Sequence, residues 1–243
     1  MRISVCIPMY NENAVIANTA NTLFEYMTST FGAGNFEIIF SDDGSLDGCG
    51  DTVRALGLEG VRVVGYEKNH GKGCAVRTAV LEACGDVVMF TDADLAYGTE
   101  VIERAGSMLR ESPDADMLIG SRNLSSDGYE EYSFLRKLMS KTYIKMLSMV
   151  GGFKLSDSQC GFKAFRREAA REIFSRCEVD GFAFDFEAIL WANKLGVKII
   201  EMPVKVINMG ESKVNIIKDT VKMLSDLMKM KKRISKEKVE KNK

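Results

Sequence analysis

The sequence is poor in the residues that build zinc sites. Its 243 residues include a single histidine, and its six cysteines contain no C-x-x-C pair. A zinc site is therefore not expected. Scattered free thiols are typical of a reducing compartment, which predicts a cytoplasmic protein.

Long apolar runs are also missing. No window of the sequence approaches the ~18 continuous apolar residues that suggest a membrane-spanning helix. The N-terminal apolar run ends at Pro8, which is too short for a signal sequence. Any membrane contact is therefore expected to be peripheral, at the cytoplasmic face.

The chain lacks the two common glycine-rich phosphate motifs. Neither G-x-G-x-x-G nor G-x-x-x-x-G-K-[ST] opens a helix anywhere in the sequence, which argues against a dehydrogenase and a P-loop ATPase. The formal net charge of −1 gives no basic footprint, so nucleic acid is not an expected partner.

Charge is distributed unevenly along the chain. Residues 229–243 carry eight Lys or Arg against two Glu, a local charge of +6, which leaves −7 for residues 1–228. This predicts one folded domain over residues 1–228 and a basic C-terminal tail over residues 229–243. The tail suggests a surface partner, and a solvated terminus is the alternative.

Strand-like and helical patterns alternate through the first half of the sequence. Such alternation predicts an α/β fold, with a mostly parallel central sheet flanked by helices in a single domain. A long helical pattern follows over residues 129–150, and 197–207 reads as one or two further strands. The expected strands are 3–8, 37–41, 61–66, 87–91 and 117–121, and the expected helices are 14–30, 49–55, 74–83 and 100–110.

Polar and acidic residues stand where the first strands end. Asp92 and Asp94 follow the buried run 87–91, and Asp42 and Asp43 follow an earlier strand. In open α/β sheets the ligand lies beyond the carboxyl ends of the strands. Carboxylates gathered there repel one another unless a cation lies among them, and oxygen ligands suit Mg²⁺ or Mn²⁺ completed by substrate phosphates. The pattern therefore predicts a divalent metal and a diphosphate substrate.

A set of ordered sequence blocks resembles a known enzyme family. The blocks, spread over about residues 7–213, are IPMYNEN, SDDGSLDG, NHGKGCAVRTAV, FTDADLA, IGSR, FLRKLMS, SDSQCGFKAFRREA, GFAFDFEA and GESK. They resemble the inverting family 2 glycosyltransferases, and more narrowly the polyprenyl-phosphate (dolichyl-phosphate) mannose and glucose synthases. The resemblance implies a glycosyltransferase A-type fold, a nucleotide-sugar donor, a divalent metal and a lipid-phosphate acceptor.

The resemblance also implies a donor site. It makes residues 1–228 the catalytic domain, with Asp92 and Asp94 holding the metal. Alternatives stay open at two places. One of the two aspartates after the second strand, Asp42 or Asp43, is alternatively the residue of an Asx-type turn, and Lys72 is alternatively a solvated loop lysine without a role at the donor. The implied donor-binding residues are Pro8, Tyr10, Glu12, Ser41, Asp43, Lys72, Asp92, Ala93 and Lys213.

One position departs from the family pattern. Mannose-type synthases typically show DADLQHP, whereas this chain reads DADLAYG and places Ala96 where a Gln can join the metal shell. Together with QCGFK and GFAFDFE, the departure favours UDP-glucose over GDP-mannose as the donor.

Three phenylalanines of the GFAFDFE block, Phe182, Phe184 and Phe186, alternate as in a strand. We interpret them as core packing around the site.

For the acceptor, the resemblance implies a phosphate held by arginine. The implied residues are Arg122, Arg136, Ser140, Gln159 and Asp185, with Asp92, Asp94, Arg122 and Arg136 as the catalytic set. Guanidinium groups suit phosphate oxygens, and an anionic phosphate attacks without a general base. Alternatives are a helix-face role for Arg136, a hydroxyl acceptor activated by a carboxylate near Asp185, and a donor-binding module without turnover.

The last helical pattern bears on membrane contact. Over residues 214–230, an apolar face is expected from Ile217, Val221, Leu224 and Met228, followed at once by the basic cluster. Such a helix can lie in the interface of an anionic membrane. The alternative is that this face packs on the sheet as the last helix of the domain.

Overall fold

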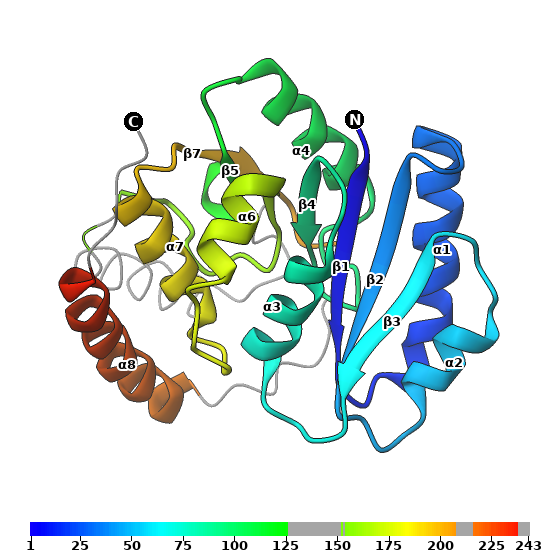
Figure 1. Cartoon of the computed structure of the whole chain (residues 1–243), viewed down its shortest axis with the longest axis horizontal. Helices are drawn as coiled ribbons and strands as arrows, with labels where there is room; N and C mark the ends of the chain where they lie inside the picture. The colour runs from blue at the N-terminus through cyan, green and yellow to red at the C-terminus, as the bar shows by residue number, and fades with distance from the viewer. Residues whose placement is uncertain (126–151, 153, 208–215, 238–243) are drawn as a thin grey trace.

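The computed structural model describes residues 1–125, 152, 154–207 and 216–237, the last range with side chains from residue 226 onward (Figure 1). The helix expected over residues 129–150 lies outside the described residues. Within the described part, no helix combines the length and apolar character needed to cross a bilayer.

A seven-stranded sheet forms the centre of the molecule, in the order β3-β2-β1-β4-β6-β5-β7. β6 runs antiparallel to its neighbours β4 and β5, and every other pairing is parallel. The strands are β1 (Ile3–Met9), β2 (Phe36–Asp43), β3 (Val61–Tyr66), β4 (Val87–Phe90), β5 (Met117–Ser121), β6 (Lys163–Arg166) and β7 (Ile199–Pro203).

Helices cover both faces of this sheet (Figure 1). The helices are α1 (Asn13–Phe31), α2 (Cys49–Ala55), α3 (Lys72–Glu82), α4 (Glu100–Glu111), the 3₁₀ turn η1 (Arg122–Leu124), α6 (Arg167–Phe174), α7 (Phe184–Leu195) and α8 (Ile216–Lys236). α1, α2 and α4 share one hydrophobic core, and α3, α6, α7 and α8 share the other. The expected α/β class with a mostly parallel sheet is confirmed.

The alternation of side chains along each strand supplies both cores. In β1, Ile3, Val5 and Ile7 enter the core under α1, whereas Cys6 enters the core under α3. Successive strand residues point to opposite faces, so a strand covered on both faces reads as an unbroken apolar run. Every strand expected before residue 125 is present, with ends shifted by at most two residues.

The region after residue 160 differs from the expected pattern. The alternation of Phe182, Phe184 and Phe186 does not mark a strand, because α7 begins at Phe184. Phe184 and Phe186 are buried as expected, but Phe182 is 62% exposed. The short β6 was not expected at all, because four residues give too little periodicity.

The last helix corrects one residue of the expected apolar face, Met228, whereas the side chains of Ile217, Val221 and Leu224 lie outside the described part of the chain. Met228 is 58% exposed, whereas Leu227, Met230 and Ile234 are buried. They join the core that α7 also lines, so the face packs against α7. α8 runs through the domain boundary expected at residue 228 and ends only at Lys236.

Candidate active site

Three parallel strands end side by side at one edge of the sheet. Pro8 and Met9 of β1 lie opposite Ser41 and Asp42 of β2, and Cys6 lies opposite Phe90 of β4. The polar residues that follow β1, β2 and β4 therefore emerge at the same edge. This is the position at which open α/β sheets bind their ligands.

The acidic turn after β4 is held by backbone contacts on both sides. Leu95 takes a left-handed conformation with φ of 49° and donates its N–H to Asp92 O at 3.0 Å. The buried Thr19 hydroxyl of α1 donates to Ala93 O at 2.6 Å. A left-handed leucine costs conformational energy, so the turn is fixed by its surroundings.

Lys72, the first residue of α3, reaches this turn. Its Nζ donates to Asp92 Oδ1 at 2.5 Å, with side chains 24% and 30% exposed respectively. Burial lowers the pKa of Lys72, but the carboxylates of Asp92 and then Asp185 outweigh it and leave the pKa raised. Lys72 therefore stays cationic, and it is not the solvated loop lysine of the alternative.

Asp94 presents a second carboxylate on the exposed side of the turn. Its Oδ1 accepts the N–H of Ala96 at 3.0 Å. Burial, followed by repulsion from Asp92, raises the pKa of Asp94. Repulsion of this kind is relieved by a cation placed between the two groups.

A buried ion pair lies close to Lys72 and Asp92. It involves a residue of β6, the strand that was not expected from the sequence. Lys163 of β6 is fully buried, and its Nζ donates to Asp185 Oδ1 at 2.5 Å and to Cys160 O at 2.8 Å. Burial raises the pKa of Asp185, and Lys163 and Lys72 partly oppose the rise. Asp185, expected to contact the acceptor or sugar, is thus also the partner of a buried lysine.

Arg122 stands at the end of β5, held by a carboxylate. Its Nε and Nη2 donate to Asp157 at 2.6 and 2.9 Å, and Asp157 is fully buried. Glu201 of β7 fixes the loop that carries Asp157 by accepting the N–H of Ser156 at 2.8 Å. The guanidinium of Arg122 is therefore oriented before any ligand arrives.

Asp43, expected at the donor, also has several partners within the protein. Its carboxylate is 3% exposed and accepts the Tyr66 hydroxyl, the Asn69 amide and the backbone N–H groups of His70 and Gly71, at 2.8–3.1 Å. It therefore holds the loop between β3 and α3. Asp42 forms the Asx-type turn of the alternative, because its Oδ1 accepts the N–H of Ser45 at 2.9 Å.

The glycines beside Lys72 make room for protein. A Cβ at Gly71 would lie 2.6 Å from Asp180 O, and one at Gly73 would lie 2.4 Å from Val179 O. The small residues of the Gly-Lys-Gly block therefore allow the segment before α7 to approach the first turn of α3.

The residues expected around the nucleobase lie at the end of β1 and β2. Tyr10 is 40% exposed, and Pro8 and Glu12 are partly buried. Ser41 is fully buried, and its hydroxyl has no hydrogen-bond partner in the described part of the chain. Three expected residues, Arg136, Ser140 and Lys213, lie outside the described residues, and Gln159 is partly exposed before β6.

Sequence reasoning missed several residues that shape this site. Besides Thr19 and Lys163, Tyr97 accepts the N–H of Gly161 at 3.1 Å, and a Cβ at Gly161 would lie 2.4 Å from Asp92 Oδ2. Lys163 and Gly161 belong to the QCGFK block, which the sequence used only as a family marker. Their role depends on contacts between distant segments.

The carboxylate oxygens of the turn after β4 suit a divalent cation such as Mg²⁺. Asp92 and Asp94 offer carboxylate oxygens at a partly exposed edge. Within the described ranges, no three acidic, cysteine or histidine side chains gather as a protein cage for a metal. Mg²⁺ is commonly held by one or two carboxylates with substrate phosphates and water, which this pair can provide.

Comparison with known sequences identifies the family. Residues 4–174 match the profile of glycosyl transferase family 2. The chain belongs to glycosyl transferase family 2. Among the relatives of this family 2 chain are dolichyl-phosphate beta-glucosyltransferases of Dictyostelium discoideum and Homo sapiens. Both are 30% identical to it, and the matches cover 82% and 83% of the chain respectively. The chain spans 64% and 66% of their lengths.

Solved structures support the same fold. Glucosyl-3-phosphoglycerate synthase from Mycobacterium tuberculosis, crystallised with Mn²⁺, uridine diphosphate and glucosyl-3-phosphoglycerate, has a TM-score of 0.68 with this family 2 chain at 20% sequence identity. The match covers 96% of this chain and 79% of the synthase. The glycosyltransferase A-type fold expected from the sequence is confirmed.

Proposed function

We propose that this chain transfers glucose from UDP-glucose to a dolichyl or related polyprenyl phosphate, with inversion at the anomeric carbon. The similarity to dolichyl-phosphate beta-glucosyltransferases over more than four fifths of the chain carries the proposal. The grouping of Lys72, Asp92 and Asp94 at the carboxyl edge of the sheet supports it, since an anionic donor and a metal need this mixture of charges.

The donor diphosphate lies over the acidic turn in this proposal. Asp92 and Asp94 would hold Mg²⁺ or Mn²⁺, and a bound ion would supply positive charge that stabilises the leaving uridine diphosphate. Lys72 fixes Asp92 and adds a second positive charge near the diphosphate. Ala96, at the position of the family's Gln, offers no side-chain ligand, so Asp92 and Asp94 would be the residues that hold the ion.

The acceptor phosphate approaches from the end of β5. Arg122, whose Nε and Nη2 are held by Asp157, binds phosphate oxygens through its guanidinium group, together with Arg136 and Ser140. The attacking phosphate oxygen forms the bond to the anomeric carbon as the bond to the leaving diphosphate breaks. A phosphate monoester is anionic at neutral pH, so the step needs no general base.

A donor screen tests this function. Labelled UDP-glucose and GDP-mannose are each incubated with dolichyl phosphate and Mn²⁺, and the organic phase is counted. We expect label from UDP-glucose in the organic phase, and its loss in Asp94→Ala with the fold intact by circular dichroism. Transfer from GDP-mannose alone would overturn the donor assignment, and full activity of Asp94→Ala without metal would overturn the metal assignment.

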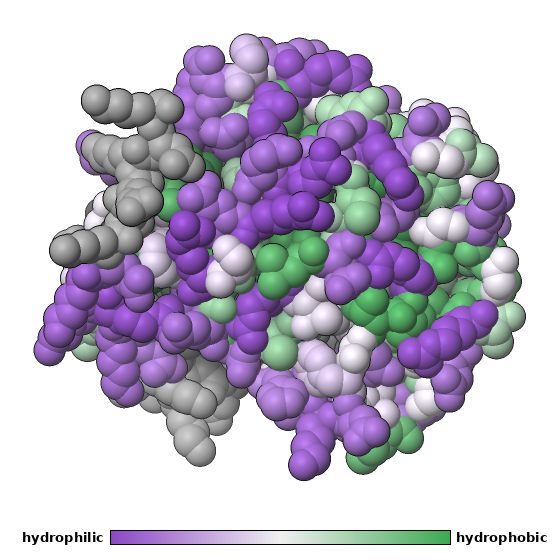
Figure 2. Space-filling view, viewed as in Figure 1, coloured by the Kyte–Doolittle hydropathy of each residue, from purple (hydrophilic) through white to green (hydrophobic). Residues whose placement is uncertain are grey.

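We also propose that α8 brings the enzyme to an anionic membrane. Lys229, Lys232 and Lys236 are exposed and, with Arg233 and Glu237, line a groove of about 650 Å³. The surface over α8, at the lower left of Figure 2, is largely hydrophilic. Each basic residue near an anionic surface contributes about 1 kcal/mol, so binding is electrostatic.

Point variants test this contact better than truncation, because removing residues after 228 also removes the buried Met230 and Ile234. Replacing Lys229, Lys232 and Lys236 with Gln is expected to reduce co-sedimentation with anionic liposomes, most clearly at low salt. The matched control replaces the exposed Arg54, Arg110 and Lys198 with Gln. Equal binding by both triple variants would refute a role for α8.

A further inference from the structure

The segment of residues 178–181, which precedes α7, connects the C-terminal helix with the turn that carries Lys72. One end of the segment is held by Glu187 of α7, which is fully buried. Glu187 Oε2 accepts the N–H groups of Glu178 and Val179 at 2.9 and 2.7 Å. A buried carboxylate with two backbone donors fixes the position of the chain that donates to it.

The other end of the segment holds the first turn of α3. Asp180 O accepts the N–H of Gly73 at 2.7 Å and the N–H of Cys74 at 3.2 Å. The Asp180 carboxylate accepts from Arg77, one turn further along α3, at 2.6 Å. The first backbone N–H groups of a helix lack partners within the helix, and Asp180 O satisfies that of Gly73 while it shares the N–H of Cys74 with Gly71 O at 3.0 Å.

Lys72 lies between two glycines that fit against this segment. Neither Gly71 nor Gly73 has room for a Cβ, because Asp180 O and Val179 O lie within 2.6 Å of where it would stand. A shift of the 178–181 segment therefore moves the backbone of Lys72. Its Nζ, 2.5 Å from Asp92 Oδ1, would move with it.

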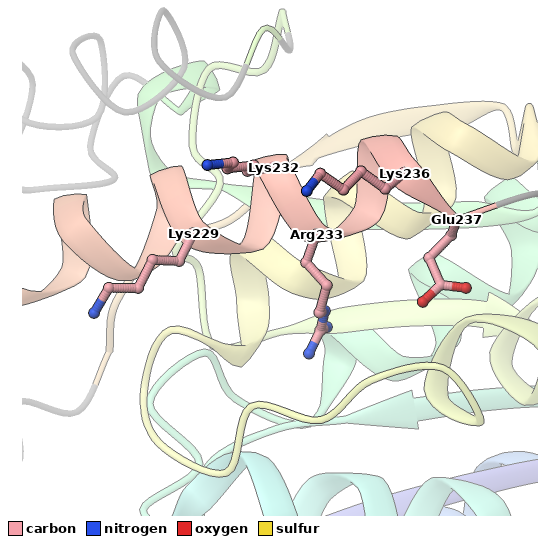
Figure 3. A pocket seen from close by; sticks show the side chains of 5 residues that line it. All are labelled: Lys229, Lys232, Arg233, Lys236 and Glu237. Carbon is pink, nitrogen blue, oxygen red and sulfur yellow. The ribbon is translucent and has the colours of Figure 1, made fainter.

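Arg233 of α8 completes the connection. Its guanidinium pairs with Glu187 Oε1 and also with Glu178. In Figure 3 the Arg233 side chain extends from α8 toward the adjacent part of the protein, on a different side of the helix from Lys232. Breaking a buried ion pair leaves an uncompensated charge, so Glu187 depends on Arg233.

We infer that Glu187 and Arg233 are positioning residues for the donor site, which hold Lys72 against Asp92 through the 178–181 segment. The inference rests on the proposed function for the role of Lys72 at the donor diphosphate. It adds that α8, the helix we assign to the membrane surface, is joined to the donor site by the two ion pairs of Arg233, with Glu187 and Glu178. Neither residue touches substrate, so both act through Lys72.

Two readouts test the inference in the full-length protein carrying Arg233→Gln. Steady-state kinetics should give a KM for UDP-glucose raised about threefold to tenfold, with kcat and the KM for dolichyl phosphate changed less. Amide hydrogen exchange at Gly73 and Cys74 should be faster by a similar factor. Glu187→Gln should act alike, and the double variant should be no worse than the more affected single variant.

Arg167→Gln is the matched control, because Arg167 is 35% exposed against 31% for Arg233 and pairs with Asp86 and Glu168 instead. It should leave both readouts unchanged. An Arg233→Gln variant with wild-type exchange at Gly73 and Cys74 and a wild-type donor KM overturns the inference. Exchange needs no substrate, so faster exchange in an enzyme that transfers no glucose would support the link and refute the proposed function.

Discussion

The carboxylate of Asp43 provides a quantitative test of how the loop between β3 and α3 is held. Replacing Asp43 with Ala removes the acceptor shared by Tyr66, Asn69 and the N–H groups of His70 and Gly71. Asn69 is exposed and Tyr66 is partly exposed, so these two side chains can reach water. The two backbone N–H groups are fixed by the chain and lose a charged acceptor.

The expected cost follows from these contacts. At roughly 1–1.5 kcal/mol for each backbone N–H and somewhat less for the side chains, Asp43→Ala should lower the free energy of unfolding by about 3 kcal/mol. For a chain of this size, that corresponds to a Tm lower by roughly 6–12 °C. Asp42→Ala, which removes the acceptor of one N–H, should cost about 1 kcal/mol.

Thermal and urea unfolding followed by circular dichroism measure both variants. Asp43→Asn keeps one acceptor oxygen and should fall between wild type and Asp43→Ala. A Tm for Asp43→Ala within about 2 °C of wild type would refute the reasoning, because 3 kcal/mol cannot be lost with so small a shift. Lower donor affinity without loss of stability would instead make Asp43 a direct contact to the nucleotide.

Three further predictions follow from other buried groups. Lys163→Met leaves Asp185 buried without its cation and should cost roughly 3–5 kcal/mol by urea denaturation, and an unchanged midpoint would contradict the ion pair. Gly73→Ala places a Cβ 2.4 Å from Val179 O and should weaken UDP binding in calorimetry, whereas Gly181→Ala, with no atom within 4 Å of its Cβ, should bind normally. Burial alone would raise the pKa of Glu37, but hydrogen bonds from Ser4 and Cys84 and the charge of Arg62 leave it lowered. Wild type should therefore lose stability relative to Glu37→Gln as the pH falls below about 4.3, and a constant difference from pH 6 to pH 3 would contradict this sign.

The parallel half of the fold was predictable from the sequence because its strands are buried on both faces. Val87–Phe90 reads as a continuous apolar run and Ile3–Met9 as one broken only by Ser4, and turn residues separate them from amphipathic helices. β6 was missed because it is only four residues long and carries Lys163, a residue type rarely buried. The burial of Lys163 depends on Asp185, which lies 22 positions away in sequence.

The site was predictable where it depends on strand ends, and not where it depends on packing. Asp92 and Asp94 follow β4 directly, so their meeting with the ends of β1 and β2 follows from the parallel topology. The contacts of Asp43 and of the glycines around Lys72 involve side chains and backbone brought together by tertiary structure. For that reason the ligand role of Asp43 stays a prediction, and the sequence did not reveal that its oxygens also hold the β3–α3 loop.

Which side of α8 is buried depends on the helix that it packs against, α7. Apolar residues occur on more than one side of the 214–230 pattern, so the sequence allowed several faces. Packing against α7 selects Leu227, Met230 and Ile234 and leaves Met228 exposed. Periodicity identified the helix, and only the neighbouring helix determined which side is buried.

The central claim, glucose transfer to a lipid phosphate, is tested most directly by comparing two acceptors that differ only in the phosphate. Labelled UDP-glucose is incubated with Mn²⁺ and either dolichyl phosphate or dolichol in the same vesicles, and label extracted into organic solvent is measured over time. The account predicts transfer to dolichyl phosphate and none to dolichol, because the proposed mechanism has Arg122 bind the phosphate and a phosphate oxygen attack the sugar. Equal transfer to dolichol, or label released only as free glucose with both lipids, would contradict it.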